Sequence, residues 1–211
     1  MSTVVVFGAT GYAGGHITQE LLSRGHRVVG VARDTAKLET RDGLTAAAGS
    51  LFDESFVAET VKGADAVVVA VRAASGELPD AIPAILRAVE SAGARLGVVG
   101  GAASLLTREG GPRVFDDNFP EAAIPEASGQ MRVLDALTSA DAEVDWFYVS
   151  PAKAFGSFNP GERTGSYRLG GDVAVTDAEG KSFISGADYA IAFVDEIEKP
   201  AHHRQRFTVG Y

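Results

Sequence analysis

Short apolar runs alternate with longer stretches of mixed polarity along most of the chain. Residues 4–7 and 65–71 are nearly unbroken apolar runs, a pattern typical of strands that are buried on both faces of a sheet. The stretch after the first run carries Ile17, Leu21 and Leu22 at helical spacing. The same patterns predict strands at 4–7, 26–32, 43–48, 65–71, 95–100, 143–149 and 206–211, and helices at 16–22, 52–61, 80–92, 126–140 and 186–198. This alternation indicates a doubly wound α/β fold, with a parallel sheet in the order 3-2-1-4-5-6 and a seventh strand.

Two segments interrupt the alternation. Residues 107–125 contain three prolines and two glycines in irregular order, and we expect a long loop that is either a wall of a substrate pocket or a solvent-facing connection. Residues 163–184 are expected to form a hairpin whose turn is Asp177-Ala178-Glu179-Gly180. No linker divides the chain, so we expect one domain over 1–211, in which about 151–190 form a small carboxy-terminal portion on the substrate side.

Local signals define the ends of two predicted helices. Pro83 is expected in the first turn of the helix at 80–92, where proline is tolerated. Ser185 and Asp188 have the spacing of a capping box, with Asp in the place of Glu, and this pair is expected to open the last helix. Pro200 ends that helix.

The stretch VVVFGATGYAGGHI combines the first strand, a glycine-rich turn and the first helix. Gly8 can adopt backbone angles that side chains forbid, Gly11 lets the main chain approach a pyrophosphate, and Gly14 lets the helix pack close to the strand. Free N–H groups at the helix start would then face the anion. The predicted phosphate-binding residues are Gly8, Ala9, Thr10, Gly11, Tyr12, Ala13 and Gly14. A tight turn without a ligand is the alternative interpretation.

Arg33 follows the second predicted strand, about 20 residues beyond the glycines, where dinucleotide-binding proteins contact the adenosine ribose. An acidic residue at this place binds the 2′-hydroxyl of NAD, whereas arginine accommodates the 2′-phosphate of NADP. Arg33 therefore favours NADP(H) over NAD(H). Asp34 leaves the choice open, because it could reach a ribose hydroxyl or cap a short helix at 35–39. Arg33 could also be a solvated surface cation.

The ends of two further strands are expected to border the same ligand, because ligands of doubly wound sheets lie outside the carboxyl ends of the strands. We therefore add Ala70, Val71 and Arg72, and at the next strand Gly100 and Gly101, to the predicted cofactor-binding residues.

These motifs resemble those of a known family. The turn GATGYAGG with a second strand ending in VAR, the stretch 145–152, the pair of stretches 160–165 and 167–170, and ISGADYA at 184–190 resemble the atypical short-chain dehydrogenase/reductase group. Within that group the resemblance is to the NmrA-like or NAD(P)H-binding proteins, which include flavin reductase and biliverdin reductase B-like members. It implies a Rossmann-type fold, a dinucleotide cofactor, and contacts of Ser50 and Leu51 with the adenine. Ser50 stands where the group often has Asp.

The usual catalytic pair of short-chain reductases is absent from the sequence. In that pair a Lys four residues after a Tyr lowers the pKa of the phenol, so that the phenol can exchange a proton with the substrate. None of the five tyrosines has such a Lys, and Ser128 and Arg132 stand at the expected positions. Tyr148 and Lys153 are five residues apart across Pro151 and are not expected to pair. Ser104, just beyond the fifth strand, is the remaining candidate catalytic group; capping a turn is its alternative role.

Composition narrows the function classes. A net charge of −9 and a pI near 4.9 argue against binding to nucleic acid or anionic membranes. The absence of cysteine excludes disulfides and thiolate catalysis, and the four histidines lack zinc-site spacing, so no metal site is expected. No apolar run approaches 18 residues and the first strand follows Met1 almost directly, which predicts a cytoplasmic protein. The partner is expected to be a small molecule, and the sequence leaves monomer and homodimer open.

Three functions are consistent with these features. The first is an NADPH-dependent reductase of a small carbonyl, quinone or flavin-like acceptor, in which the protein mainly positions cofactor and substrate. The second is an NADP(H)-sensing regulatory protein of the NmrA-like kind, which binds the cofactor without turnover. The third is a sugar-nucleotide epimerase, which the short region after the sixth strand disfavours.

Overall fold

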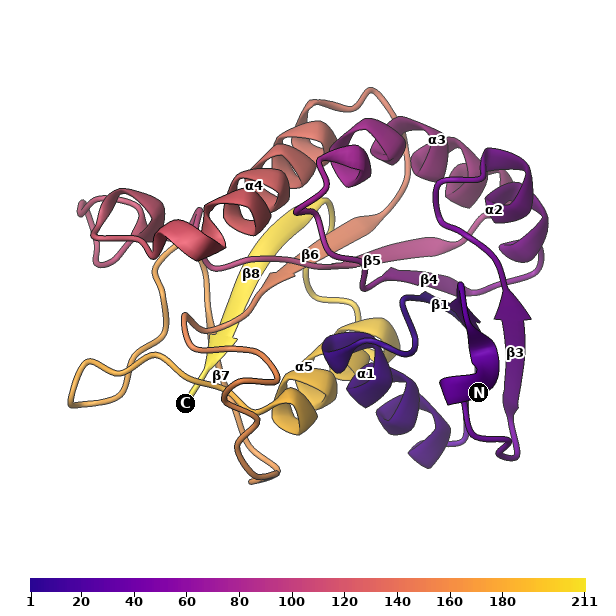
Figure 1. Cartoon of the computed structure of the whole chain (residues 1–211), viewed down its shortest axis with the longest axis horizontal. Coiled ribbons are helices and arrows are strands. Elements are labelled where there is room, and N and C mark those ends of the chain that lie inside the picture. Colours follow the sequence, from indigo (N-terminus) through magenta and orange to yellow (C-terminus); the bar gives the residue numbers. More distant parts are fainter.

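The computed structural model describes all 211 residues, and its centre is an eight-stranded sheet in the order β3-β2-β1-β4-β5-β6-β8-β7 (Figure 1). All neighbouring strands are parallel except β7 and β8, which are antiparallel. The predicted doubly wound α/β fold and its strand order are therefore confirmed. The strands are β1 (Thr3–Phe7), β2 (Arg27–Ala32), β3 (Leu44–Ala48), β4 (Ala66–Val69), β5 (Arg95–Val99), β6 (Trp146–Ser150), β7 (Arg168–Gly170) and β8 (Gln205–Gly210).

Helices cover both faces of the sheet (Figure 1). Because side chains alternate along a strand, Val5 and Phe7 of β1 pack toward one helical layer, whereas Val4 and Val6 pack toward the other. Both sets are buried, which explains the unbroken apolar run at the start of the chain. One layer holds α1 (Tyr12–Ser23) and α5 (Gly186–Glu198), and the other holds α2 (Glu54–Thr60), α3 (Glu77–Ala92) and α4 (Ile124–Ser139).

The start of α3 differs from the prediction. The helix begins at Glu77, after Gly76 with a φ of 81°, so that Pro83 lies inside the helix and not in its first turn. Leu78 is fully buried and Pro79 is buried, and this packing holds the additional first turn in place. Pro83 itself is exposed. A proline inside a helix has no N–H to donate, and its ring crowds the carbonyl of the residue four positions earlier.

The antiparallel pair of the carboxy-terminal portion also differs from the predicted hairpin. The turn at 177–180 is present, since the Gly180 N–H donates to the Asp177 carbonyl at 3.1 Å. The segments flanking the turn, however, do not pair with each other as strands. Instead β7 pairs with β8, because the free edge of β8 offers main-chain partners that β7 satisfies.

The long loop at 107–125 contains two short 3₁₀ turns and is fastened to the carboxy-terminal portion. Leu106 bridges to Arg113 within the loop and to Val173 outside it. Leu105 and Val114 are buried with Ala174 in a small separate cluster. This anchoring places the loop beside residues 172–174; its role as a pocket wall stays a prediction.

Candidate functional site

The glycine turn is packed so tightly that it admits no side chains at two positions. A Cβ on Gly8, whose φ is +85°, would lie 2.4 Å from the Ala70 carbonyl oxygen. A Cβ on Gly14 would lie 2.1 Å from the Gly8 carbonyl oxygen. The Gly11 N–H closes the turn by donating to the same Gly8 oxygen at 2.9 Å. The turn therefore brings the main chains of β1, β4 and α1 into direct contact.

The start of α1 leaves hydrogen-bond donors free. Gly11 is the N-cap residue and provides no capping side chain, and the first turn contains no acidic residue. The N–H groups of Tyr12, Ala13 and Gly14 have no acceptor within the protein. Together with the helix dipole these donors favour an anion, so the residues present fit the phosphates of a dinucleotide.

Arg33 and Asp34 have different environments at the end of β2. The Asp34 carboxylate accepts a hydrogen bond from the Ala36 N–H at 2.9 Å and caps the 3₁₀ turn Thr35–Lys37. This contact supports the capping alternative for Asp34. Arg33 is exposed and forms no ion pair, so its guanidinium is available to a ligand. Its contact with a 2′-phosphate stays a prediction.

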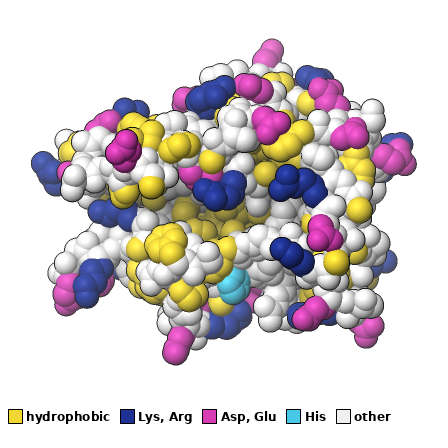
Figure 2. Space-filling model, in the orientation of Figure 1, with side chains coloured by type: hydrophobic (Ala, Val, Ile, Leu, Met, Phe, Trp, Pro, Cys, Tyr) yellow, Lys and Arg dark blue, Asp and Glu magenta, His cyan; other side chains and the backbone are white.

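The ends of β4 and β5 reach the same edge of the sheet as the glycine turn. The Ala70 N–H donates to the Phe7 carbonyl at 2.9 Å, and Arg72 follows with an exposed side chain. Gly100 continues β5, and its N–H donates to the Val149 carbonyl at 3.0 Å. The molecule is hollowed between its two helical layers; apolar side chains floor the hollow, and Lys and Arg side chains lie at its rim (Figure 2). The structure thus brings the predicted ends of β1, β4 and β5 together.

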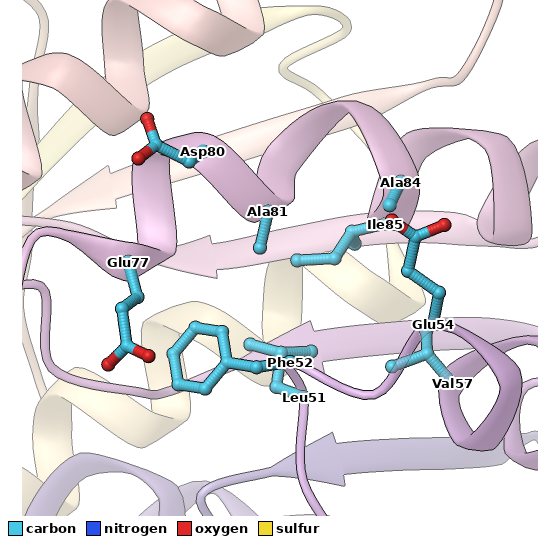
Figure 3. Close-up of a pocket in the computed structure, with 9 residues that line it drawn as sticks. All are labelled: Leu51, Phe52, Glu54, Val57, Glu77, Asp80, Ala81, Ala84 and Ile85. Carbon is cyan, nitrogen blue, oxygen red and sulfur yellow. The ribbon is translucent and has the colours of Figure 1, made fainter.

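The two residues assigned to the adenine lie at the end of β3. The Ser50 hydroxyl accepts a hydrogen bond from the Phe52 N–H at 3.2 Å, and Leu51 is buried. Leu51 lines a cavity of about 250 Å³ between α2 and α3, in which the Phe52 ring faces α3 (Figure 3). None of the glycine-turn residues lines this cavity.

A second cavity, of about 480 Å³, lies in the carboxy-terminal portion. Six of its seven lining residues fall within the predicted substrate-side segment 151–190, and the seventh is Tyr211. They are Ala154, Asn159, Asp177, Lys181, Ser182, Phe183 and Tyr211.

All five tyrosine hydroxyls are occupied by hydrogen bonds within the protein. Tyr148 and Tyr189 are buried, and burial raises the pKa of both phenols above the ordinary value. The Tyr12 hydroxyl donates to the Pro160 carbonyl at 3.2 Å and accepts from the Gly186 N–H at 3.0 Å. Tyr167 donates to Asp195, and Tyr211 donates to Ser185 and Asp188. No lysine takes part in these contacts, so no tyrosine has the lysine neighbour that lowers the pKa of the phenol in the usual catalytic pair.

The other candidate catalytic groups are held in ordinary contacts. The Ser104 hydroxyl accepts a hydrogen bond from Arg206 at 3.2 Å, and no base lies in contact with it. Lys153 is exposed. Arg132, which stands at the position expected for the lysine of a Tyr-Lys pair, binds Asp80 of α3 at 2.9 Å. A catalytic role for Ser104 stays a prediction.

Sequence reasoning missed a set of residues that support this edge from α4. Glu126 accepts hydrogen bonds from the loop after β4, and Gln130 contacts the Tyr148 hydroxyl. A signal was present, because Glu126 and Gln130 lie four residues apart on one helix face, beside the positions examined for the Tyr-Lys pair.

Comparison with known proteins identifies the family. The family model described as NAD(P)H-binding matches residues 8–200. The chain belongs to this family. The predicted resemblance to NAD(P)H-binding proteins is thereby confirmed. YwnB of Bacillus subtilis, an uncharacterized protein, is 41% identical over 213 residues, which cover 97% of this chain and 96% of YwnB.

Two solved structures resemble this NAD(P)H-binding protein over its whole length. A proposed epimerase from Bacteroides thetaiotaomicron is 37% identical with a TM-score of 0.91, over 100% of this chain and 97% of the other. A proposed NADH-flavin reductase from Streptococcus pneumoniae is 34% identical with a TM-score of 0.87, over 100% and 99%. Among the helices of the chain, none combines the length and apolar character needed to cross a membrane.

Proposed function

We propose that the protein is an NADPH-dependent reductase of a small carbonyl, quinone or flavin-like acceptor. The observation that carries the proposal is the glycine turn: it leaves three N–H groups at the start of α1 unpaired, and the exposed Arg33 lies at the end of the neighbouring β2. The name of the pneumococcal relative supports a flavin-like acceptor. A cytosolic location belongs to the same proposal, because such a reductase depends on other enzymes to reduce its NADP⁺ again.

The cofactor and the protein have different roles in such a reaction. Bound NADPH would supply the hydride, so the protein has to hold the cofactor and the acceptor in an orientation that allows hydride transfer. The N–H groups of Tyr12, Ala13 and Gly14 would hold the phosphates, and Arg33 would bind the 2′-phosphate. For a carbonyl acceptor the proton would come from water or Ser104, because every tyrosine hydroxyl is occupied within the protein.

Arg33→Ala tests the preference for NADP(H). We expect the variant to lose about 1.5–3 kcal/mol of NADPH affinity, the usual value of a hydrogen bond to a charged group, which is roughly a tenfold to 150-fold rise in Kd. NADH affinity should hardly change. Arg27→Ala is the matched control, because Arg27 is an exposed arginine at the opposite end of the same strand. Calorimetric titration of the wild type and both variants measures the six constants, and an equal loss for both cofactors in Arg33→Ala would contradict the 2′-phosphate role.

Turnover decides between the reductase and a second candidate, an NADP(H)-sensing protein. The occupied tyrosine hydroxyls favour the sensor, since no tyrosine hydroxyl is free for a substrate. NADPH consumption is to be followed with quinones, flavins and aldehydes. Consumption with any of them supports the reductase, and tight NADPH binding without consumption supports the sensor. The name of the Bacteroides relative keeps an epimerase as a third candidate, which requires product formation without net NADPH consumption.

A further inference from the structure

One carboxylate holds the loop that follows β4. Glu126, in the first turn of α4, accepts hydrogen bonds from the Ala73 N–H at 3.0 Å, the Ala74 N–H at 3.1 Å and the Arg72 Nε at 3.2 Å. Three consecutive residues of the loop are therefore bound by a single side chain. Gly129, one turn further along α4, packs against the same loop, and a Cβ there would lie 2.2 Å from the Ala73 carbonyl oxygen.

The hydrogen bonds continue from Glu126 to the loop that follows β5. The Gln130 side-chain amide donates to Glu126 at 3.1 Å. The Tyr148 hydroxyl donates to the main-chain and side-chain oxygens of Gln130, at 3.1 and 3.3 Å. The Gly101 N–H donates to the Tyr148 hydroxyl at 3.0 Å. Tyr148 can lie there because Gly100 has no Cβ, which would lie 2.0 Å from the Tyr148 ring.

We propose that Glu126, Gln130 and Tyr148 form a relay of positioning residues, which fixes the loops 72–74 and 100–101 at the spacing that NADP(H) requires. The inference rests on the cofactor binding assumed in the proposed function. Glu126 and Gln130 lie in the first turns of α4, the helix in which the Tyr-Lys pair of short-chain reductases is expected, and Tyr148 lies in β6. In this chain these residues support the cofactor site and do not supply a proton.

The chemistry of the three groups fits positioning and not proton transfer. Four donors surround the Glu126 carboxylate, which keeps it an acceptor. Tyr148 is 1% exposed and Gln130 is 5% exposed, so water cannot replace a lost hydrogen bond without rearrangement. Removing one member therefore leaves a buried polar group without a partner and moves a loop at the cofactor edge.

Two substitutions break the relay at different ends. Glu126→Gln keeps the shape but replaces one carboxylate oxygen by an amide donor, which then faces two of the four donors, and it leaves the core untouched. Tyr148→Phe keeps the ring and leaves the Gly101 N–H unpaired. Glu90→Gln and Tyr167→Phe are matched controls: Glu90 accepts a main-chain N–H from Glu143, and Tyr167 donates to Asp195, and neither contact involves the loops 72–74 or 100–101.

The readouts are the Kd for NADPH, the emission of the bound reduced nicotinamide, and the Tm. We expect a roughly tenfold higher Kd and altered emission in each relay variant, and about the same loss in the double variant, because members of one network are not additive. The controls should leave Kd within about twofold, whatever their effect on Tm. A double variant with the product of the two single losses, or relay variants that lower only Tm, would overturn the relay.

The wild-type titration separates this inference from the proposed function. If the wild type binds NADPH but reduces no acceptor, the reductase fails, and the relay is still measured by Kd and emission. If the wild type binds neither cofactor, both fail together.

Discussion

Three glycines of the turn serve three different contacts. Gly8 combines a positive φ with the approach of the Ala70 carbonyl, and Gly14 meets the Gly8 carbonyl itself. At Gly11 a Cβ would lie 3.2 Å from the same carbonyl oxygen, closer than ordinary packing permits without a small shift. The spacing of three residues therefore reflects how one carbonyl, that of Gly8, is enclosed by the start of α1.

Gly14→Ala should lower the free energy of unfolding by about 1–3 kcal/mol, the usual range for forcing a methyl group into a packed site. It should also weaken NADPH binding, because the helix start would move away from β1. Gly15→Ala is the control: its nearest contact would be the Ala9 carbonyl oxygen at 3.6 Å, and alanine favours the helix by up to about 1 kcal/mol. Urea unfolding measures both variants. Equal stabilities of the two would show that the turn relaxes around the methyl group.

At the residue scale the sequence predicts what the main chain needs but not which side chains meet. The glycine turn could be predicted, because glycine stands in the sequence at each position where the main chain leaves no room for a side chain. Asp34 had two possible roles, and only the position of the Ala36 N–H decides for the cap. The contact of Tyr148 with Gln130 and Gly101 joins three elements, so neither its periodicity nor its neighbours in sequence could reveal it.

Among the elements, α1 and α5 are joined through the side chain of Tyr12. Its hydroxyl bonds to Gly186 at the start of α5 and to Pro160 in the carboxy-terminal portion. Gly186 allows this approach, because a Cβ there would lie 2.3 Å from the His16 ring and 2.8 Å from the Tyr12 ring. Tyr12 was predicted as a cofactor-binding residue. Its N–H lies at the predicted phosphate site, whereas its hydroxyl binds Pro160 and Gly186.

Tyr12→Phe should therefore separate stability from cofactor binding. We expect the free energy of unfolding to fall by about 1–2 kcal/mol, since the variant loses two hydrogen bonds and leaves the Gly186 N–H unpaired. The Kd for NADPH should stay nearly unchanged, because the main chain of Tyr12 is intact. Urea unfolding and calorimetry test the two parts. A large loss of affinity at unchanged stability would place the hydroxyl in the cofactor site.

The ends of helices and strands could be predicted where a hydrophobic pattern stops at a clear residue. They could not be predicted where the element depends on pairing with a distant segment. Strand order follows from the alternation of strands and helices, which allows few topologies. The partner of β7 is β8, which lies about 40 residues further along the chain, and only three residues of β7 pair with it. A local turn signal at Asp177–Gly180 therefore predicted the wrong partner, although the turn itself is present.

Across the whole molecule, buried carboxylates join segments that are far apart in the sequence. Glu20 of α1 is 5% exposed and binds both Arg24 and Arg163. Glu196 of α5 is likewise 5% exposed and binds Arg95. Burial alone would raise the pKa of Glu20, but the hydrogen bonds from Arg163 and Arg24 outweigh it, and its pKa lies below the ordinary range. Burial is likewise outweighed at Glu196, whose pKa is lowered by hydrogen bonds from His202 and Arg95.

These lowered pKa values make the folded state sensitive to acid. A carboxyl group whose pKa is lower in the folded than in the unfolded chain contributes its full stability above the unfolded pKa, about 4.3 for glutamate, and loses that contribution as the pH falls through the folded pKa. The titration of Glu20 should therefore leave the free energy of unfolding unchanged between pH 8 and about pH 5, and should lower it below about pH 4.3.

Glu20→Gln should reduce this acid dependence. At neutral pH we expect a loss of about 1–2 kcal/mol, less than the 3–5 kcal/mol of a fully buried pair, because the Arg163 side chain is half exposed. As the pH falls through the lowered folded-state pKa of Glu20, the variant and the wild type should converge, since protonation removes the same charge from Glu20. Glu109→Gln, at an exposed carboxylate without an ion-pair partner, should follow the wild-type curve throughout. Urea unfolding at a series of pH values measures the three curves, and a Glu20→Gln curve parallel to the wild type in acid would show that Glu20 does not carry the linkage.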